Sequence, residues 1–172
     1  ERYVKVFFSG RDKSQRSLTY SLILDSKNNF NLASISRVPV LMPGKLGTFD
    51  DSGAMASWVL SYKGKVYLYY IGWNLGVTVP FRNSIGLAIS TDKENFVKVA
   101  EYPIVDRGKN DEYFTASCCV VPFNDSQLIM YYVSCIGWEK INDENIANKT
   151  EVKTGLRSNE NIEIISGLAE GD

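Results

Sequence analysis

The stretch that decides the fold reads Thr48-Phe49-Asp50-Asp51-Ser52-Gly53-Ala54-Met55-Ala56-Ser57-Trp58-Val59-Leu60. Residues 110–121, NDEYFTASCCVV, have the same layout: an acidic pair, a short spacer, Ala-Ser and an apolar run. Asp51 and Asp111 lie 60 residues apart, and so do Ala56 and Ala116. An acidic turn that leads twice into a buried strand predicts two copies of one structural unit, whose carboxylates could converge on one site.

The repeat extends beyond the acidic turns. Aromatic pairs recur with a spacing of 62 residues, at 7–8, 69–70 and 131–132, and a turn follows each pair. Residues 19–30 also resemble residues 84–96. Each unit therefore reads as an inner strand, a hairpin, an aromatic strand, a small-residue strand and an edge strand led by Phe, which is the pattern of a four-stranded propeller blade.

Period-2 alternation dominates the chain, and no window shows a helical stripe. The expected strands span residues 3–8, 18–24, 55–62, 65–73, 84–90, 96–100, 114–121 and 127–136, with hairpin turns at 62–65 and 123–127. We expect an all-β protein, a partial β-propeller of about three four-stranded antiparallel blades with a short polar/β tail. A β-sandwich with accidental internal similarity is the alternative fold.

The expected domains are residues 1–138, the blades of an incomplete propeller, and residues 139–172, a tail of uncertain origin. The propeller is expected to be incomplete because closed propellers need at least about four blades. Exposed blade edges would favour self-association.

Composition excludes several classes of function. The 172 residues carry 19 Lys and Arg against 20 Asp and Glu, so there is no basic excess for nucleic acid or an anionic membrane. No apolar run approaches the roughly 20 residues of a membrane span. The absence of His excludes a Ser-His-Asp triad and a His-ligated zinc site. We expect no cofactor, and no ligand spacing demands a metal ion.

Three cysteines, an odd number with two of them adjacent, predict reduced thiols rather than a disulfide framework. Unpaired cysteines favour a cytoplasmic location, although the sequence leaves the location open.

Four carboxylates lie where the inner strands of adjacent blades begin: Asp50, Asp51, Asp111 and Glu112. Two carboxylates that face each other across a polar pocket are what glycosidic bond cleavage requires, one as the acid and one as the base or nucleophile. Crowding would raise the pKa of one of them. The alternative is that both stretches merely cap turns, as Asp and Asn often do.

Cationic and aromatic side chains accompany these turns. Arginine can hold hydroxyl, carboxylate or phosphate groups through paired hydrogen bonds, and an aromatic ring can stack on a sugar face. The candidate substrate-binding residues are Asp50, Arg11, Trp73, Arg82, Arg107 and Tyr113, with Phe49 at a similar loop. Structural salt bridges and ordinary strand-end aromatics are the alternatives.

Five segments resemble the five-bladed β-propeller glycosidase superfamily, which contains glycoside hydrolase families 43 and 32. They are PVLMPG (39–44), GTFDDSG (47–53), YLYYIGWN (67–74), PFRNSIGLA (80–88) and DEYFTAS (111–117), and the resemblance covers residues 2–138. It implies a glycan or sugar conjugate as partner.

The superfamily uses three acidic residues from successive blades: a base or nucleophile Asp, a pKa-modulating Asp and a general-acid Glu. The resemblance implies that Asp51, or Asp50, is the second and that Glu112 is the third. The first-blade Asp is expected upstream of Glu1.

The tail has a separate resemblance. Segments NDENIA (142–147), TEVKTGL (150–156) and IEIISGLAEGD (162–172) are similar to the membrane-proximal β-domain of periplasmic adaptor proteins of efflux pumps. Three interpretations follow: a glycoside hydrolase-like protein, a non-catalytic carbohydrate-binding or assembly module, and a fusion that carries a piece of an efflux adaptor.

Overall fold

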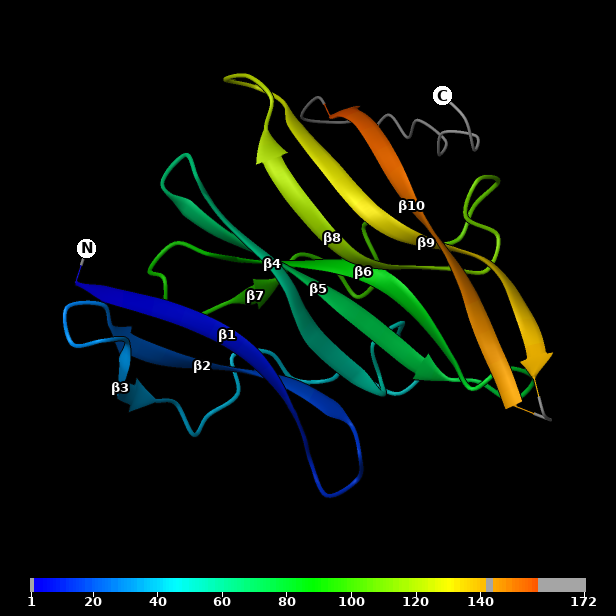
Figure 1. Cartoon of the computed structure of the whole chain (residues 1–172), viewed down its shortest axis with the longest axis horizontal. Coiled ribbons are helices and arrows are strands. Elements are labelled where there is room, and N and C mark those ends of the chain that lie inside the picture. Colours follow the sequence, from blue (N-terminus) through cyan, green and yellow to red (C-terminus); the bar gives the residue numbers. More distant parts are fainter. Residues whose placement is uncertain (1, 142–143, 158–172) are drawn as a thin grey trace.

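The computed structural model describes residues 2–141 and 144–157, which form β-strands joined by turns and loops (Figure 1). The strands are β1 (Tyr3–Arg11), β2 (Ser17–Asp25), β3 (Asn31–Ile35), β4 (Gly53–Tyr62), β5 (Lys65–Leu75), β6 (Phe81–Ser90), β7 (Val97–Lys98), β8 (Phe114–Pro122), β9 (Leu128–Ile141) and β10 (Glu144–Arg157). The described ranges contain no helix, and thus none long and apolar enough to cross a membrane. The expected all-β class is confirmed.

Strand pairing divides the chain into three successive antiparallel units. The N-terminal unit is β1-β2-β3, the central unit is β4-β5-β6-β7 and the C-terminal unit is β8-β9-β10. A single parallel bridge, Ser17 to Gly53, joins the first two units into one seven-stranded sheet. The units follow one another across the molecule, from β1 and β2 on the left of Figure 1 to β9 and β10 on the right.

The two predicted hairpin turns are confirmed. Tyr62 pairs with Lys65, and the two residues between them, Lys63 and Gly64, have positive φ angles of 48° and 76°. Two consecutive left-handed residues form the type I′ turn, whose twist matches that of the flanking strands. In the second hairpin, the Phe123 backbone N–H donates to the Gln127 carbonyl.

Strand register corrects the predicted alignment of the two acidic turns. The strands that follow them begin at Gly53 and Phe114, which lie opposite Trp73 and Cys135 on the aromatic strands. These partners place the first acidic residue of each turn three residues before its strand. The structural counterpart of Asp111 is therefore Asp50, whereas the sequence spacing had aligned Asp111 with Asp51.

The spacing of 60 was misleading because the β-bulges are shifted relative to the aromatic strands. One bulge lies between Ala56 and Trp58, next to the partner residue Tyr70, and the other lies between Ala116 and Cys118. An extra residue in a bulge displaces the sequence pattern by one without moving the rest of the strand. Asp51 and Glu112 consequently hold equivalent positions in successive units.

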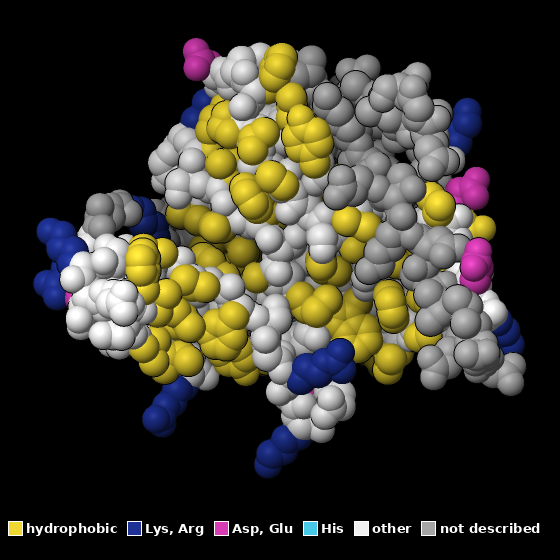
Figure 2. Space-filling model, in the orientation of Figure 1, with side chains coloured by type: hydrophobic (Ala, Val, Ile, Leu, Met, Phe, Trp, Pro, Cys, Tyr) yellow, Lys and Arg dark blue, Asp and Glu magenta, His cyan; other side chains and the backbone are white. Residues whose placement is uncertain are grey.

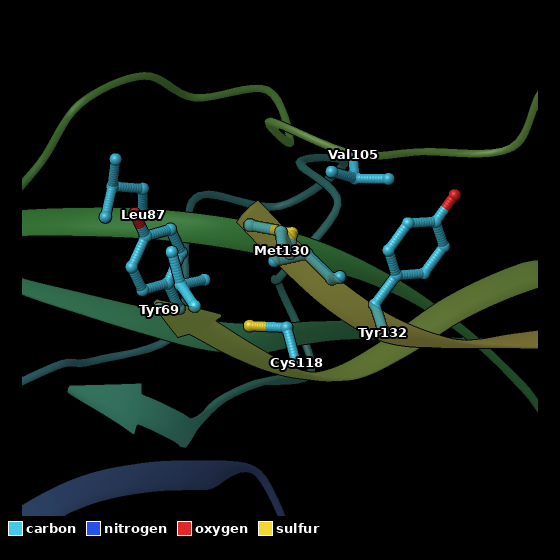
Figure 3. Close-up of a cluster of buried hydrophobic side chains, with 8 residues drawn as sticks. Tyr69, Leu87, Val105, Cys118, Met130 and Tyr132 are labelled. Carbon is cyan, nitrogen blue, oxygen red and sulfur yellow. The ribbon is translucent and has the colours of Figure 1, made fainter. Parts of the chain in front are cut away.

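Hydrophobic side chains fill the spaces between units. The cluster between the central and C-terminal units is shown in Figure 3, and its buried members are Tyr69, Ile85, Leu87, Val105, Cys118, Val120, Met130 and Tyr132. A second cluster, around Leu68 and Tyr70, receives Phe7 of β1 and Phe96. Burying a large apolar side chain contributes roughly 1.5–3 kcal/mol, so these clusters fix how the strands of neighbouring units face each other.

Strands continue beyond the predicted boundary at Trp138. β9 runs to Ile141, and β10 pairs antiparallel with it from Glu144 to Arg157, with two irregularities in register. This strand was not predicted because residues 144–157 are mostly polar and show no alternating apolar pattern. The domain division at 138 stays a prediction, and residues 162–172, which resemble an adaptor segment, lie outside the described residues.

Candidate functional site

The predicted site residues lie at one end of the strands, which we call the rim. There β1, β5 and β9 finish and β2, β4, β6 and β8 begin, and most of these ends lie along the lower side of Figure 1. The rim pairs are Arg11 with Ser17, Gly53 with Trp73, Asn74 with Arg82 and Phe114 with Cys135. Antiparallel pairing thus gathers residues from 11 to 135 at one edge of the molecule.

Asp51 is half-buried at the rim and held by donors of the same chain. The Asn74 side-chain amide and the Ser52 hydroxyl donate to Oδ1, at 2.7 and 2.9 Å, and the Gly47 backbone N–H donates to Oδ2 at 2.9 Å. Burial would raise the pKa of Asp51, but these hydrogen bonds to Gly47, Asn74 and Ser52 hold it below its usual value. Asp51 is therefore an ionised acceptor near neutral pH and is suited to fix or polarise a group rather than to donate a proton.

Trp73 and Arg11 meet across the junction of the first two units. The Arg11 guanidinium lies 5.7 Å from the centre of the Trp73 ring, within the range of a cation–π interaction. Gly53 permits this position, since a Cβ there would lie 2.1 Å from the indole Nε1. The Nε1 group is buried and has no hydrogen-bond partner in the described part of the chain.

Arg82 lies near the start of the next strand, β6. It is directly opposite Asn74 in the β5–β6 ladder, so the two side chains leave the sheet on the same face. Its neighbour Phe81 packs on Phe114 and Trp138, with ring centroids 5.7 and 5.2 Å apart. This aromatic cluster anchors the start of β6 to the start of β8 and brings the second acidic turn to the rim.

Glu112, Tyr113 and Arg107 occupy the loop before β8. Glu112 and Arg107 are exposed, and the Tyr113 side chain is 38% exposed. Within residues 2–141 no hydrogen bond or ion pair joins these three to Asp51, Trp73 or Arg82. The structure thus brings Arg11 to Trp73 and Asp51 to Asn74 at the rim, with Arg82 opposite Asn74. It leaves Glu112, Tyr113 and Arg107 on the neighbouring turn.

Asp50 points away from this cluster into the protein. It is 2% exposed, and its Oδ2 accepts hydrogen bonds from the Tyr70 hydroxyl at 3.1 Å and the Lys98 ammonium at 2.5 Å. Its Oδ1 accepts one from the Thr48 hydroxyl at 3.0 Å. Burial, with the adjacent Asp50 charge, raises the pKa of Tyr70 far above its usual value, so the phenol remains a donor. These contacts give Asp50 a bracing role between the acidic turn and the strands of its unit.

Asp111 repeats only part of this arrangement. It is also 2% exposed, and its Oδ2 accepts a hydrogen bond from the Tyr132 hydroxyl at 2.8 Å. Its Oδ1 is buried and, among the described residues, has no partner. The Asp–Tyr contact is thus a shared feature of the two units, whereas the lysine contact belongs to the central unit alone.

Sequence reasoning missed Asn74 and the Asp–Tyr contacts. The signal for the contacts was present, because each Asp precedes the second Tyr of its aromatic pair by a similar distance, 20 residues in one unit and 21 in the other. Asn74 could not be selected from spacing, since its role depends on the loop between Thr48 and Gly53. In the described ranges no group of three acidic or cysteine side chains could hold a metal ion.

Comparison with known proteins gives relatives of similar sequence. Two curated proteins of Mycobacterium tuberculosis, the uncharacterized proteins MT1551 (strain CDC 1551 / Oshkosh) and Rv1502 (strain ATCC 25618 / H37Rv), are each 35% identical to this chain over 140 residues. The match covers 81% of this chain and 46% of each relative, so the chain spans about half the length of the curated relatives it matches. No family model matches the chain.

Among solved structures, a complex of BT0996 and RGII matches with a TM-score of 0.59 at 13% identity, over 96% of this chain and 57% of that protein. Another, described as a glycoside hydrolase, matches with a TM-score of 0.49 at 15% identity, over 87% of this chain and 40% of that protein. The first likeness shows a shared fold.

Proposed function

We propose that the rim binds a glycan and that the chain belongs to a β-propeller protein of the glycosidase type. The observation that carries this proposal is that two contacts lie at the same end of β5, the Trp73–Arg11 stack and the hydrogen-bonded pair of Asp51 and Asn74. A sugar presents an apolar face that stacks on an aromatic ring and hydroxyl groups that bond to carboxylates, amides and guanidinium groups. The rim supplies all of these within one group of strand ends.

The solved structure with the same fold supports the ligand class, because its description names a complex with RGII, a glycan. That complex belongs to the other protein, and the identity of 13% carries no residue of its site to this chain. The choice of ligand therefore rests on the chemistry of the rim.

Binding to immobilised polysaccharides, measured by affinity electrophoresis of the 172-residue chain, tests the proposal. We expect retardation by at least one polysaccharide and a loss of at least about tenfold in affinity for Arg82→Ala, because one charged hydrogen-bonding group contributes roughly 1.4 kcal/mol or more. Arg37→Ala removes an arginine that is also exposed, from the loop after β3, and serves as the matched control. Equal retardation of both variants, or none of the wild type by any polysaccharide, would refute binding at the rim.

Within this proposal, Glu112 acts as the general acid of a glycosidase and Asp51 as the ionised carboxylate that modulates it. The equivalent positions of the two residues in successive units and the exposure of Glu112 support these roles. The lowered pKa of Asp51 fits an ionised partner. A first-blade Asp would complete the constellation in a longer parent protein.

The alternative is glycan binding without hydrolysis. Release of reducing ends separates the two, measured on a longer parent with the polysaccharides that it binds. Glu112→Gln should abolish turnover and leave glycan affinity within about twofold, because it removes a proton donor and keeps the shape of the side chain. Unchanged turnover would exclude Glu112 as the acid, and a parent that binds but never hydrolyses would support the binding module.

A further inference from the structure

The N-terminal unit differs from the other two in one respect. Aromatic strand β5 lies between β4 and β6, and aromatic strand β9 lies between β8 and β10. The corresponding strand, β1, pairs with β2 alone among the described strands. One edge of β1, nine residues long, therefore presents backbone N–H and C=O groups to whatever lies beside it.

A hollow of about 250 Å³ follows this edge, and we call it the β1–β4 hollow. Its lining comes from the middle of β1, the bulged part of β4 and one residue of β5: Lys5, Val6, Phe7, Ala56, Ser57, Trp58, Val59 and Leu68. Figure 2 shows hydrophobic side chains over the N-terminal unit and a recessed hydrophobic region between that unit and the strands beyond it. The Trp58 and Val59 side chains are 37% and 42% exposed.

The next junction along the chain shows what fills the equivalent space. There the inner strand β8 packs against the inner strand β4. The Ser57 hydroxyl accepts a hydrogen bond from the Cys118 backbone N–H at 2.8 Å, and the Trp58 indole donates to the Val120 carbonyl at 2.8 Å. Side chains of one inner strand thus bond to the backbone of the following inner strand, and Cys118 and Val120 are buried by the contact.

We propose that the β1–β4 hollow is the docking site of one extended strand of the inner-strand type, supplied by a polypeptide segment outside residues 1–172. The strand runs antiparallel to β1, as β4 runs to β5 and β8 to β9. It bonds to the β1 backbone along one side and places its small and hydroxyl side chains against the backbone of β4. Its sequence resembles GAMASWVLSY of β4, with small residues before a Ser at the bulge.

Two observations support this occupant. β1 is already fixed for docking, because Lys5 pairs with Glu94 at 2.8 Å and the Phe7 ring packs edge-on against Phe96 with centroids 5.5 Å apart. An ordered edge loses little conformational freedom when a strand adds to it. The curated relatives also have more than half of their length outside the matched stretch, and a segment of that length could contain the docking strand.

A labelled peptide with the β4 sequence, residues 53–62, tests the docking site in trans. We expect saturable one-to-one binding to the 172-residue chain by fluorescence anisotropy, together with slower hydrogen exchange of the β1 amides. Val59→Lys places a charge on the wall of the hollow and should raise the Kd at least about tenfold. Val97→Lys, at a 71% exposed valine of β7, is the matched control and should leave the Kd unchanged.

Circular dichroism and thermal unfolding of both variants separate loss of docking from loss of fold, and a scrambled peptide controls for nonspecific adhesion. Absence of saturable binding, equal binding by Val59→Lys, or protection that misses β1 would overturn the proposal. A dimer of the chain alone that Val59→Lys dissociates would assign the edge to a second copy and would also overturn it. None of these outcomes depends on glycan binding at the rim.

Discussion

Asp50 and Asp111 are equivalent residues whose surroundings differ. Both are buried and both accept a hydrogen bond from a tyrosine, but Asp50 also pairs with Lys98. Burying a carboxylate without a cation lowers the stability of the folded state. When a buried carboxylate is paired, removing it lowers stability because the cation is left buried without its partner. The two residues should therefore respond differently to the loss of charge.

We predict that Asp50→Asn destabilises the chain by about 1–3 kcal/mol, because it leaves the Lys98 ammonium beside a neutral amide. Asp111→Asn should change stability by less than about 0.5 kcal/mol or raise it, since no cation pairs with this buried carboxyl group among the described residues. Urea unfolding followed by far-UV circular dichroism measures both. Equal destabilisation by the two substitutions would contradict the difference seen in their contacts.

Asp51 makes stability depend on pH. Its folded pKa is below the usual value of about 3.9, so the unfolded chain binds a proton more readily than the folded chain. Its contribution is complete above about pH 4 and is lost as the pH falls through the lowered folded pKa. The contribution should be below about 1 kcal/mol, because the residue is partly exposed.

Unfolding free energies measured between pH 6 and pH 2 test this dependence. Stability should fall towards the acid end, and Asp51→Asn should reduce the slope while lowering stability at pH 6. A variant with the same slope as the wild type would show that Asp51 is not held as described.

At the scale of elements, the small residues of β6 make room for the aromatic strand. A Cβ added at Gly86 would lie 2.3 Å from the Tyr70 ring, and that ring is fully buried and bonded to Asp50. A rigid, enclosed ring cannot move aside. The pairing of an aromatic strand with a small-residue strand is thus a steric requirement of the central unit.

We predict that Gly86→Ala destabilises the chain by about 1–3 kcal/mol through overpacking. Gly108→Ala is the control, because no atom lies within 4 Å of the Cβ position there and its backbone is not left-handed. Thermal unfolding of both variants measures the difference. A Gly86→Ala chain as stable as the control would mean that β5 and β6 can separate at that point.

The elements that sequence predicted best are those with strong local signals. Alternating strands and the turn at Lys63-Gly64 were found because their patterns depend on neighbouring residues. β10 was missed because its strand pairing with β9 does not rest on an apolar run. The alignment of the acidic turns was wrong by one residue because the position of a β-bulge can be located only from the pairing with the neighbouring strand.

The candidate site was predictable only in its residue types. Arg11 and Trp73 were chosen separately, and their contact depends on the bridge between Ser17 and Gly53 that joins two units. The inward direction of Asp50 and the outward direction of Asp51 depend on the loop that both share, and no spacing distinguishes them. The catalytic roles of Asp51 and Glu112 remain predictions.

At the scale of the whole molecule, three units follow one another, with the inner strands β4 and β8 of the second and third units packed together and the rim ends at one edge. This arrangement explains why residues distant in sequence, such as Arg11, Trp73 and Arg82, meet at one edge. It also explains why substitutions at the junctions between units should affect stability, whereas substitutions at the rim should affect ligand binding. The same chain can therefore be tested for fold and for function separately.

The most direct test of glycan binding is a two-dimensional ¹⁵N NMR titration of the chain with oligosaccharides. The side-chain resonances of Trp73 Nε1 and Asn74 Nδ2 report on the rim, and the indole of Trp58, which is bonded to Val120, reports on the middle of β4. Glycan binding at the rim predicts saturable shifts of Trp73 and Asn74 with Trp58 unmoved. Shifts centred on Trp58, or a spectrum that no oligosaccharide changes, would contradict it.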